Sequence, residues 1–389
     1  MNPHNWIQAE HDRLIERVIA WANENSGSRN EAGLNRVAEQ IQREFQDLDP
    51  DNSALQFLGE DATARCPLLR LAKRPNTRKK VLFFGHLDTV YGLEHPFQKT
   101  QLLSDGRLNG PGVCDMKGGL AILLCGLTAF ENSVREKRFG WTILINSDEE
   151  LGSPLSTPYF ADAVRGHEVA FGFEPALRDG SIASSRRGTG NFTLQFHGKA
   201  AHSGRNPYDG LNAFIPLARF ILECQRLNAR RDSIFINPAI VTGGTAANVV
   251  PDFASCQLNV RTTTANDETW ILEELHRFIA EIPKDSGYRA EISGGFTAPP
   301  KVLNPQIDSL IELVRKAGQK IGVDIDAKPT GGTCDGNRLA GFGLPNLDNL
   351  GARGDHIHSQ AEFIYPESLV ERARLLYELL LELNERPTQ

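Results

Sequence analysis

Three adjacent carboxylates follow an apolar stretch of the sequence. Asp148, Glu149 and Glu150 come just after the segment 141–146, which has the composition of a buried strand. Adjacent carboxylates repel one another and resist removal from water, so either solvent or a cation must stabilise them. Active sites of open α/β sheets lie at the carboxyl ends of strands, which favours the cation. Glu174 also follows an apolar segment, although a Glu-Pro turn explains it equally well by itself.

A histidine and an aspartate end another apolar run. His86 and Asp88 follow residues 81–84, whose sequence is Val-Leu-Phe-Phe. If the strand continues, positions two apart share a face, so the Asp88 carboxylate can contact the His86 imidazole and orient it for a metal ion. An ordinary strand-end histidine beside a turn aspartate is the alternative, and these residues alone do not decide between the two.

A glycine-rich segment spans residues 110–119 and contains Asp115. Glycines let the backbone approach other groups closely and adopt unusual dihedral angles, so this loop can hold Asp115 where an ordinary loop cannot. The spacing of a phosphate-binding loop is absent, because Lys117 precedes Gly118 and no hydroxyl residue follows. A purely structural turn remains the alternative.

Two histidines, His356 and His358, lie near the C-terminus, and spacing alone does not say which of them binds a metal. Taken in order, the motifs read H-x-D, G-x-x-D, E-E-x-G, a Glu before Pro, and His-Ser. This order resembles the zinc-dependent metallopeptidase family that includes acetylornithine deacetylase, succinyl-diaminopimelate desuccinylase, aminoacylase and glutamate carboxypeptidase. The resemblance covers nearly the whole chain and is closest to the glutamate carboxypeptidase type.

The resemblance implies a centre of two zinc ions. It assigns Asp115 as the ligand that bridges both ions. The further ligands are His86 and Glu174 for one ion and Glu150 and His358 for the other. His358 is preferred to His356 because the family's ligand precedes a serine and then an acidic residue, here Ser359 and Glu362. Histidine and carboxylate ligands suit zinc without thiolates, and Co²⁺ or Mn²⁺ are alternative metals.

The same resemblance assigns catalytic roles. Glu149 matches the family's general base, which takes a proton from the attacking water and later passes it to the leaving amine. Asp88 is assigned to the catalytic set as the partner that orients His86. The family's bridging aspartate is commonly followed by a cis peptide bond, so we predict one between Asp115 and Met116.

These residues require a sheet whose strands end side by side. Apolar runs alternate with helical patterns before about residue 187 and again after the prolines at 299 and 300, which is typical of α/β architecture. In between, the pattern becomes β-α-β-β-α-β, a ferredoxin-like unit. We therefore expect a catalytic domain of residues 1–186 and 297–389, with a mostly parallel sheet flanked by helices. Residues 187–296 would form an inserted α+β lid or dimerisation domain.

The inserted unit contains three further candidates by resemblance. His202 lies in a segment that matches the family's G-K-x-x-H-[SA] pattern, whose histidine reaches the active site of the partner subunit in a homodimer. Asn248 and Arg261 match positions that read polar groups and carboxylates of the substrate. Without the family, we would interpret His202 and Asn248 as turn residues and Arg261 as a surface residue at a strand end.

The composition and charge of the chain limit the kinds of partner that it can bind. The chain has 389 residues, a net charge of −7 and a pI near 5.9, which disfavours nucleic acid or an anionic membrane as a partner. We find no apolar run of about 20 residues, and the charged N-terminus does not resemble a secretory signal, so we expect a cytoplasmic protein. The six cysteines form no C-x-x-C pair and indicate neither a disulfide framework nor a thiolate zinc site.

Together these observations predict a metal-dependent hydrolase. We expect it to cleave an amide or peptide bond of an N-acyl amino acid or small peptide that carries a free carboxylate. No basic residue stands at Ser181 or Thr297 to help read a glutamate side chain, so an acetylornithine deacetylase-like N-deacylase is the alternative. A two-metal phosphodiesterase would need basic residues that bind phosphate, and we find none clustered around these motifs. A non-catalytic relative that binds a metal or a peptide is a further alternative, but such a protein would have no need of Glu149 as a base.

Overall fold

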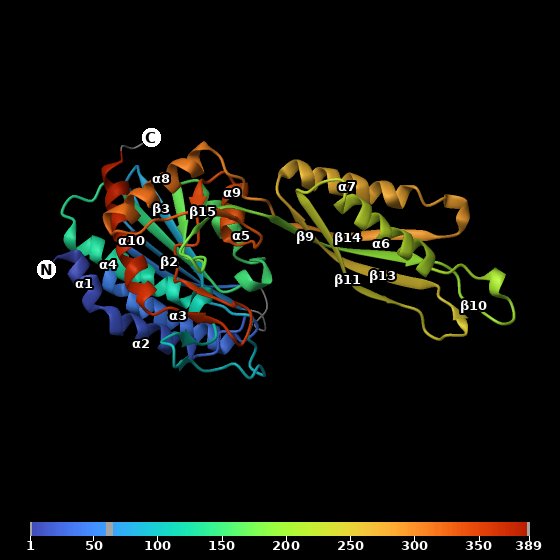
Figure 1. Ribbon diagram of the computed structural model, residues 1–389, viewed down its shortest axis with the longest axis horizontal. Helices are drawn as coiled ribbons and strands as arrows, with labels where there is room; N and C mark the ends of the chain where they lie inside the picture. The colour runs from blue at the N-terminus through green and yellow to red at the C-terminus, as the bar shows by residue number, and fades with distance from the viewer. Residues whose placement is uncertain (1, 60–64, 387–389) are drawn as a thin grey trace. The chain divides into compact units, whose positions relative to one another are not determined.

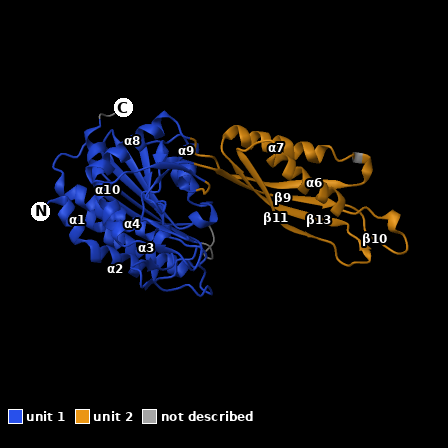
Figure 2. Ribbon diagram, viewed as in Figure 1, with its two compact units in different colours: residues 1–185, 303–330, 334–389 blue, residues 186–302, 331–333 orange. Residues whose placement is uncertain are grey.

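The computed structural model describes residues 2–59 and 65–386, and the chain divides into two compact units (Figure 2). Unit 1 comprises Met1–Ser185, Leu303–Thr330 and Cys334–Gln389, and unit 2 comprises Arg186–Val302 with Gly331–Thr333. The expected boundary at residue 296 is wrong, because it falls inside a strand, β14, that runs from Arg289 to Ala298. Beyond that strand, Lys301 still bridges to Arg186 within unit 2.

Unit 1 is built on a six-stranded sheet in the order β1-β2-β6-β3-β7-β16 (Figure 1). The pairs β6-β3, β3-β7 and β7-β16 are parallel, whereas β1-β2 and β2-β6 are antiparallel. The strands span Asn52–Leu58 (β1), Cys66–Lys73 (β2), Lys80–His86 (β3), Gly140–Asn146 (β6), Val169–Gly172 (β7) and Asn346–Leu347 (β16). The predicted mostly parallel sheet is confirmed.

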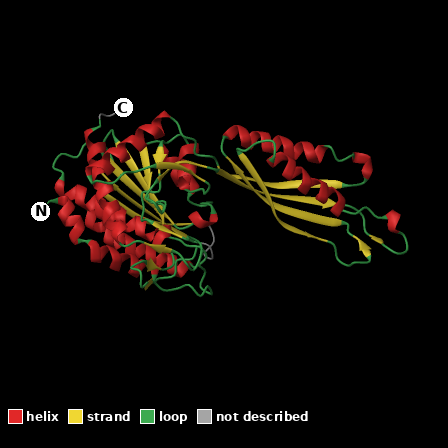
Figure 3. Ribbon diagram, viewed as in Figure 1, coloured by secondary structure: helices red, strands yellow, loops and turns green. Residues whose placement is uncertain are grey.

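Helices cover both faces of this sheet, as Figure 3 shows. They span Pro3–Ala9 (α1), His11–Ala22 (α2), Glu31–Phe45 (α3), Gly118–Ser133 (α4), Thr157–Val164 (α5), Pro305–Lys320 (α8), Asp335–Gly341 (α9) and Glu367–Glu385 (α10). Along β3, Val81 and Phe83 belong to one apolar core while Leu82 and Phe84 belong to another. Because neighbouring strand residues point to opposite faces, this division shows that the sheet is buried on both sides.

Two helix boundaries differ from the sequence pattern. The periodicity of residues 5–23 predicts one helix, but the chain breaks at Glu10 between α1 and α2. The pattern of residues 209–228 also predicts one helix, but the observed helix, α6, spans only Phe214–Asn228. Pro207–Asp209 forms a separate short turn, and the extended backbone of Gly210 keeps that turn from joining the helix.

Unit 2 is a four-stranded antiparallel sheet in the order β11-β13-β9-β14, with helices α6 and α7 packed on it. Its strands and second helix span Gly188–His197 (β9), Ile234–Gly243 (β11), Phe253–Thr262 (β13), Ala265–Ala280 (α7) and Arg289–Ala298 (β14). The chain order is β9-α6-β11-β13-α7-β14, which is the expected ferredoxin-like sequence of elements. A two-stranded ribbon pairs Ala201–His202 (β10) with Val249–Val250 (β12).

A small four-stranded sheet in unit 1 brings two loops together. Its order is β17-β18-β5-β4, with strands Gly354–Asp355, Phe363–Ile364, Leu108–Asn109 and Gln101–Leu102 respectively. Strand β5 leads into the glycine-rich loop, and β17 and β18 flank the loop that contains His358. The pairing of β18 with β5 therefore places these two loops side by side. A further pair joins Ile182–Arg186 (β8) to Ala327–Thr330 (β15).

One helical stretch corrects the sequence analysis. Residues Val113–Ser133 are long and apolar enough to cross a membrane, contrary to our reading that no such run exists. However, 94% of the 18-residue apolar window in this stretch is buried inside the protein. It covers the face of the sheet as α4, so we interpret it as the core helix of a soluble protein.

Candidate metal centre

The candidate ligands gather where three neighbouring parallel strands end. His86 is the last residue of β3, which lies between β6 and β7 in the sheet. Glu149 and Glu150 stand in a short turn after β6, and Glu174 lies two residues after β7. Carboxyl ends of parallel strands share one edge of a sheet, so this topology brings the side chains together as predicted.

Asp115 reaches the same place from the loop before α4. The peptide bond between Asp115 and Met116 is cis, which confirms the prediction made from the family. Gly112 has a φ of 71°, a conformation that favours glycine. A Cβ on Gly119 would lie 1.9 Å from the carbonyl oxygen of Phe173, so only glycine lets the start of α4 pack against the end of β7. This close approach brings the loop that carries Asp115 to the strand end that precedes Glu174.

The Asp115 carboxylate lies between two imidazoles. Its Oδ1 is 3.1 Å from His86 Nε2, and its Oδ2 is 3.3 Å from His358 Nε2. Each imidazole also faces a second carboxylate, since His86 Nε2 is 3.9 Å from Glu174 Oε1 and His358 Nε2 is 3.1 Å from Glu150 Oε2. The five side chains thus fall into two sets that share Asp115, which is the arrangement expected of a bridging ligand.

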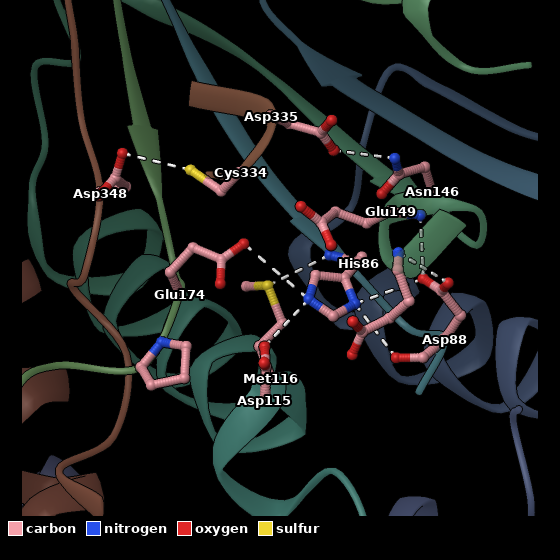
Figure 4. Close-up of polar contacts among 12 residues, drawn as sticks. His86, Asp88, Asp115, Met116, Asn146, Glu149, Glu174, Cys334, Asp335 and Asp348 are labelled. Atoms are coloured by element: carbon pink, nitrogen blue, oxygen red, sulfur yellow. Dashed lines mark hydrogen bonds and ion pairs between the residues drawn. The ribbon is translucent and has the colours of Figure 1, made fainter. Parts of the chain in front are cut away.

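Asp88 holds both a ligand and the acidic turn (Figure 4). His86 Nδ1 is 3.1 Å from the Asp88 carbonyl oxygen and 3.3 Å from its Oδ1. The backbone N–H groups of Glu149 and Glu150 donate to Oδ1 and Oδ2 of Asp88 at 3.3 and 3.2 Å, and Ser28 Oγ donates to Oδ2 at 2.8 Å. A proton on His86 Nδ1 facing Asp88 leaves the Nε2 lone pair free for a cation.

The charges of the cluster are unbalanced. Burial opposes the charge on Asp115, but hydrogen bonds from His358 and His86 outweigh it and hold the pKa of this carboxyl well below its usual range. Hydrogen bonds to Asp115 and Glu150 raise the pKa of His358 to about 10. Burial raises the pKa values of Glu149 and Glu150 despite the nearby imidazoles. Carboxylates outnumber imidazoles here, so the cluster favours a cation.

The residues fit a metal ion. One ligand atom each from His86, Asp115 and Glu150 lie within 4.8 Å of one another, and no other such group occurs among the described residues. Imidazole nitrogen and carboxylate oxygen suit zinc and, with less preference, cobalt or manganese. The six cysteines are all buried, none forms a disulfide, and none belongs to this group.

Comparison with known proteins identifies the family. The model of peptidase family M20/M25/M40 matches residues 82–382, which span the candidate ligands. The chain belongs to this family. The resemblance inferred from the sequence is therefore confirmed, and the protein is a metal-dependent hydrolase.

Two sequence relatives of this M20-family chain illustrate its position. Carboxypeptidase G2 of Pseudomonas sp. (strain RS-16) is 27% identical over 318 residues, which cover 77% of this chain and 74% of that protein. YqjE of Bacillus subtilis (strain 168), an uncharacterized protein, is 24% identical over 379 residues and covers 95% of this chain and 98% of its own length.

Solved structures of the M20 family share the fold. The aminopeptidase PepT of Bacillus cereus has a TM-score of 0.77 at 19% identity, covering 96% of this chain and 98% of its own. YxeP of Bacillus subtilis, described as a dinuclear metal-binding peptidase of the M20 family, has a TM-score of 0.72 at 18% identity, covering 97% and 99%. At these identities the likeness concerns the fold alone.

The three candidates in unit 2 of this M20-family chain are only partly brought together. His202 and Asn248 are exposed neighbours on the β10-β12 ribbon, where the Ser203 N–H donates to the Asn248 carbonyl oxygen at 3.0 Å. Arg261 lies apart from them on β13, and its Nε donates to Asn259 Oδ1 at 3.0 Å. Burial and the nearby Arg187 lower the pKa of Arg261. Their roles stay predictions.

Sequence reasoning missed several buried polar residues around the centre of this M20-family chain. Lys117 is 1% exposed and its Nζ donates to Ser26 Oγ at 2.8 Å, while burial lowers the pKa of the lysine to about 8. Glu362, which the sequence used only as a motif marker, is also 1% exposed, and burial raises its pKa to about 7. Its partner Tyr91 had no motif at all. The only signal in the sequence for Lys117 and Glu362 was that each is a charged residue close to a metal-ligand motif.

Proposed function

We propose that this chain is a dinuclear zinc hydrolase of the glutamate carboxypeptidase type. It cleaves an amide or peptide bond of an N-acyl amino acid or small peptide that carries a free carboxylate. The observation that supports this proposal most is the position of Asp115 between two imidazoles, each of which faces a further carboxylate. The relative named carboxypeptidase G2 favours a carboxypeptidase over an N-deacylase.

In this proposal His86 and Glu174 would hold one ion, Glu150 and His358 would hold the other, and Asp115 would be the ligand they share. When bound, the metal would supply Lewis-acid activation of the scissile carbonyl and of the attacking water. Glu149 removes the proton from that water through its carboxylate and delivers it to the leaving amine. Burial raises the pKa of Glu149, and a raised pKa makes the carboxylate a stronger base.

Asp88 positions the machinery in two ways. Its contact with His86 Nδ1 fixes the tautomer that presents Nε2 to the metal. Its two carboxylate oxygens also accept the backbone N–H groups of Glu149 and Glu150 and so fix the turn that carries both residues. Glu150 cannot act as the base while it is a ligand, which leaves that role to Glu149.

Unit 2 supplies substrate recognition in this proposal. Arg261, helped by Asn248, binds the free carboxylate through the planar fork of its guanidinium. His202 acts in the active site of the partner subunit of a homodimer. The edge strand β11 supports pairing of two copies, because Phe235, Ile240 and Val241 are exposed on it. We place the enzyme in the cytoplasm, with a small amide or peptide and no nucleic acid or membrane as its partner.

A substrate screen tests the proposal. The purified chain is loaded with Zn²⁺, Co²⁺ or Mn²⁺ and assayed on N-acyl amino acids and dipeptides with glutamate, aspartate, ornithine or diaminopimelate as the leaving amine. We expect the highest kcat/KM with zinc on a substrate whose leaving amine is glutamate. Preference for N-acetylornithine would favour the deacylase, and metal binding without hydrolysis of any substrate would favour a binding protein.

A further inference from the structure

Glu362 is a buried carboxyl that the proposed mechanism does not use. It lies at the end of the loop between β17 and β18, four residues after His358, and only 1% of it is exposed. Its Oε1 accepts the backbone N–H groups of Cys114 and Asp115 at 2.9 and 3.1 Å. Glu362 therefore joins the loop of one metal ligand to the backbone of another.

Tyr91 extends this connection to a third segment. Its Oη lies 2.9 Å from Glu362 Oε2 and 2.9 Å from the carbonyl oxygen of Ser359, the residue next to His358. Tyr91 is itself buried and follows the β3 segment that ends in His86. The hydroxyl thus contacts the His358 loop at two points.

The His358 loop needs such anchors. His356 and His358 have φ values of 59° and 61°, in the left-handed region that non-glycine residues rarely adopt. The His358 side chain is 50% exposed, so packing does not hold it, whereas His86 is 1% exposed at the end of a central strand. The position of His358 relative to Asp115 therefore depends on hydrogen bonds between the loops.

We propose that Glu362, with Tyr91, is a positioning residue that sets the distance between Asp115 and His358 and thereby the affinity of the metal that Glu150 and His358 hold. This inference rests on the proposed two-metal centre. The other ion depends less on Glu362, because His86 ends one strand of the main sheet and Glu174 lies two residues after another. Loss of Glu362 should therefore weaken one metal site selectively.

Metal titration of the whole protein tests this inference. The metal-free parent and its variants are titrated with Zn²⁺ in competition with a chromophoric chelator, and His358→Ala shows which equivalent belongs to the His358 site. We expect Glu362→Ala to weaken that same equivalent by about 10- to 100-fold and to leave the other near the parent value. Glu362→Gln should bind like the parent, because its amide oxygen accepts both N–H groups and its NH₂ donates to Tyr91.

A matched control separates positioning from general stability. Glu131 is another glutamate of unit 1, with a side chain 7% exposed, and it accepts hydrogen bonds from Trp141 Nε1 at 2.9 Å and from Arg74. It lies 13 residues into α4 from Gly118, about 20 Å along the helix from the centre. Glu131→Ala should lower the melting temperature and leave both zinc affinities unchanged.

The outcomes decide between the ideas. Unchanged zinc binding by Glu362→Ala, equal weakening of both equivalents, or a Gln variant that behaves like the Ala variant would each overturn the positioning role. If Glu362→Ala does not fold, Tyr91→Phe decides, because it removes only the hydroxyl and should weaken the His358 equivalent alone; unchanged binding would overturn the inference. A parent that binds fewer than two equivalents would refute the dinuclear centre itself, and the inference with it.

Discussion

Replacement of Glu149 by glutamine isolates the proton-transfer step. Glutamine has nearly the same shape, and the backbone N–H at this position still donates to Asp88 Oδ1 at 3.3 Å, so the turn and the ligand Glu150 keep their places. An amide cannot accept the proton from water at neutral pH. The variant should therefore bind two zinc ions and remain folded while its turnover is lost.

The size of the loss follows from the surroundings of Glu149. Removal of a general base costs about 10²- to 10⁴-fold, which is about 2.7 to 5.4 kcal/mol of transition-state stabilisation. Burial raises the pKa of Glu149, and the carboxylates of Glu174 and Asp335 raise it further against the opposing charge of His86. A base that also protonates the leaving amine contributes more, so we expect a loss near 10⁴-fold in kcat.

The assay compares kcat and KM of Glu149→Gln and the parent at saturating zinc, with metal content measured by elemental analysis. Glu168→Gln, the same change at the residue before β7 and at the opposite edge of the sheet, is the matched control and should keep parental turnover. Near-normal kcat in a Glu149→Gln protein that carries full metal would refute the assignment of the base.

Four further results are expected. Asp115→Ala should bind less than one zinc equivalent by elemental analysis, because both ions lose a ligand; two retained equivalents would contradict the bridge. Chelation of the metal should destabilise the folded protein by about 2.7 kcal/mol relative to free zinc at about 100 times its Kd, seen as a lower melting temperature. Arg261→Lys should reduce kcat/KM on free-carboxylate substrates and hardly change the poor rate on the matching C-terminal amides, since lysine keeps the charge and loses the fork; an equal loss on both would assign Arg261 to folding. Mixed subunits carrying His202→Ala and Glu149→Gln should regain partial activity, and no recovery after proven exchange would place His202 outside the partner's site.

The strand ends were the predictable part of the centre. His86, Glu150 and Glu174 follow apolar runs that could only be strands, and parallel strands in an α/β sheet align their carboxyl ends. Asp115 and His358 were predicted as ligands from the order of the motifs and not from strand or helix patterns, because their loops have no periodic pattern. The ferredoxin-like order of unit 2 was likewise readable, since each of its elements is amphipathic and separated by turn residues.

Contacts between distant loops were not predictable. Tyr91 and Glu362 are separated by 271 positions, and no local pattern in either segment announces the hydrogen bond that joins them. The end of unit 2 was misplaced for a related reason, because the glycines at 294 and 295 look like a turn although β14 continues through them to Ala298. Propensity favours a break there, and pairing with β9 overrides it.

The division of unit 1 into separate stretches of chain has a consequence for biosynthesis. Helix α4 approaches α10 so closely that a Cβ on Gly126 would lie 2.7 Å from Leu376, and β7 pairs with β16, yet α10 and β16 follow unit 2 in the sequence. A ribosome that adds about 5 to 20 residues per second takes roughly 8 to 30 s to pass from residue 185 to residue 346. Unit 2 is synthesised during that interval, while the surface of α4 that packs against α10 is still uncovered. The largest apolar core of the nascent chain is therefore the last to be covered. The His358 loop, which emerges after β16, completes the metal centre only near the end of synthesis.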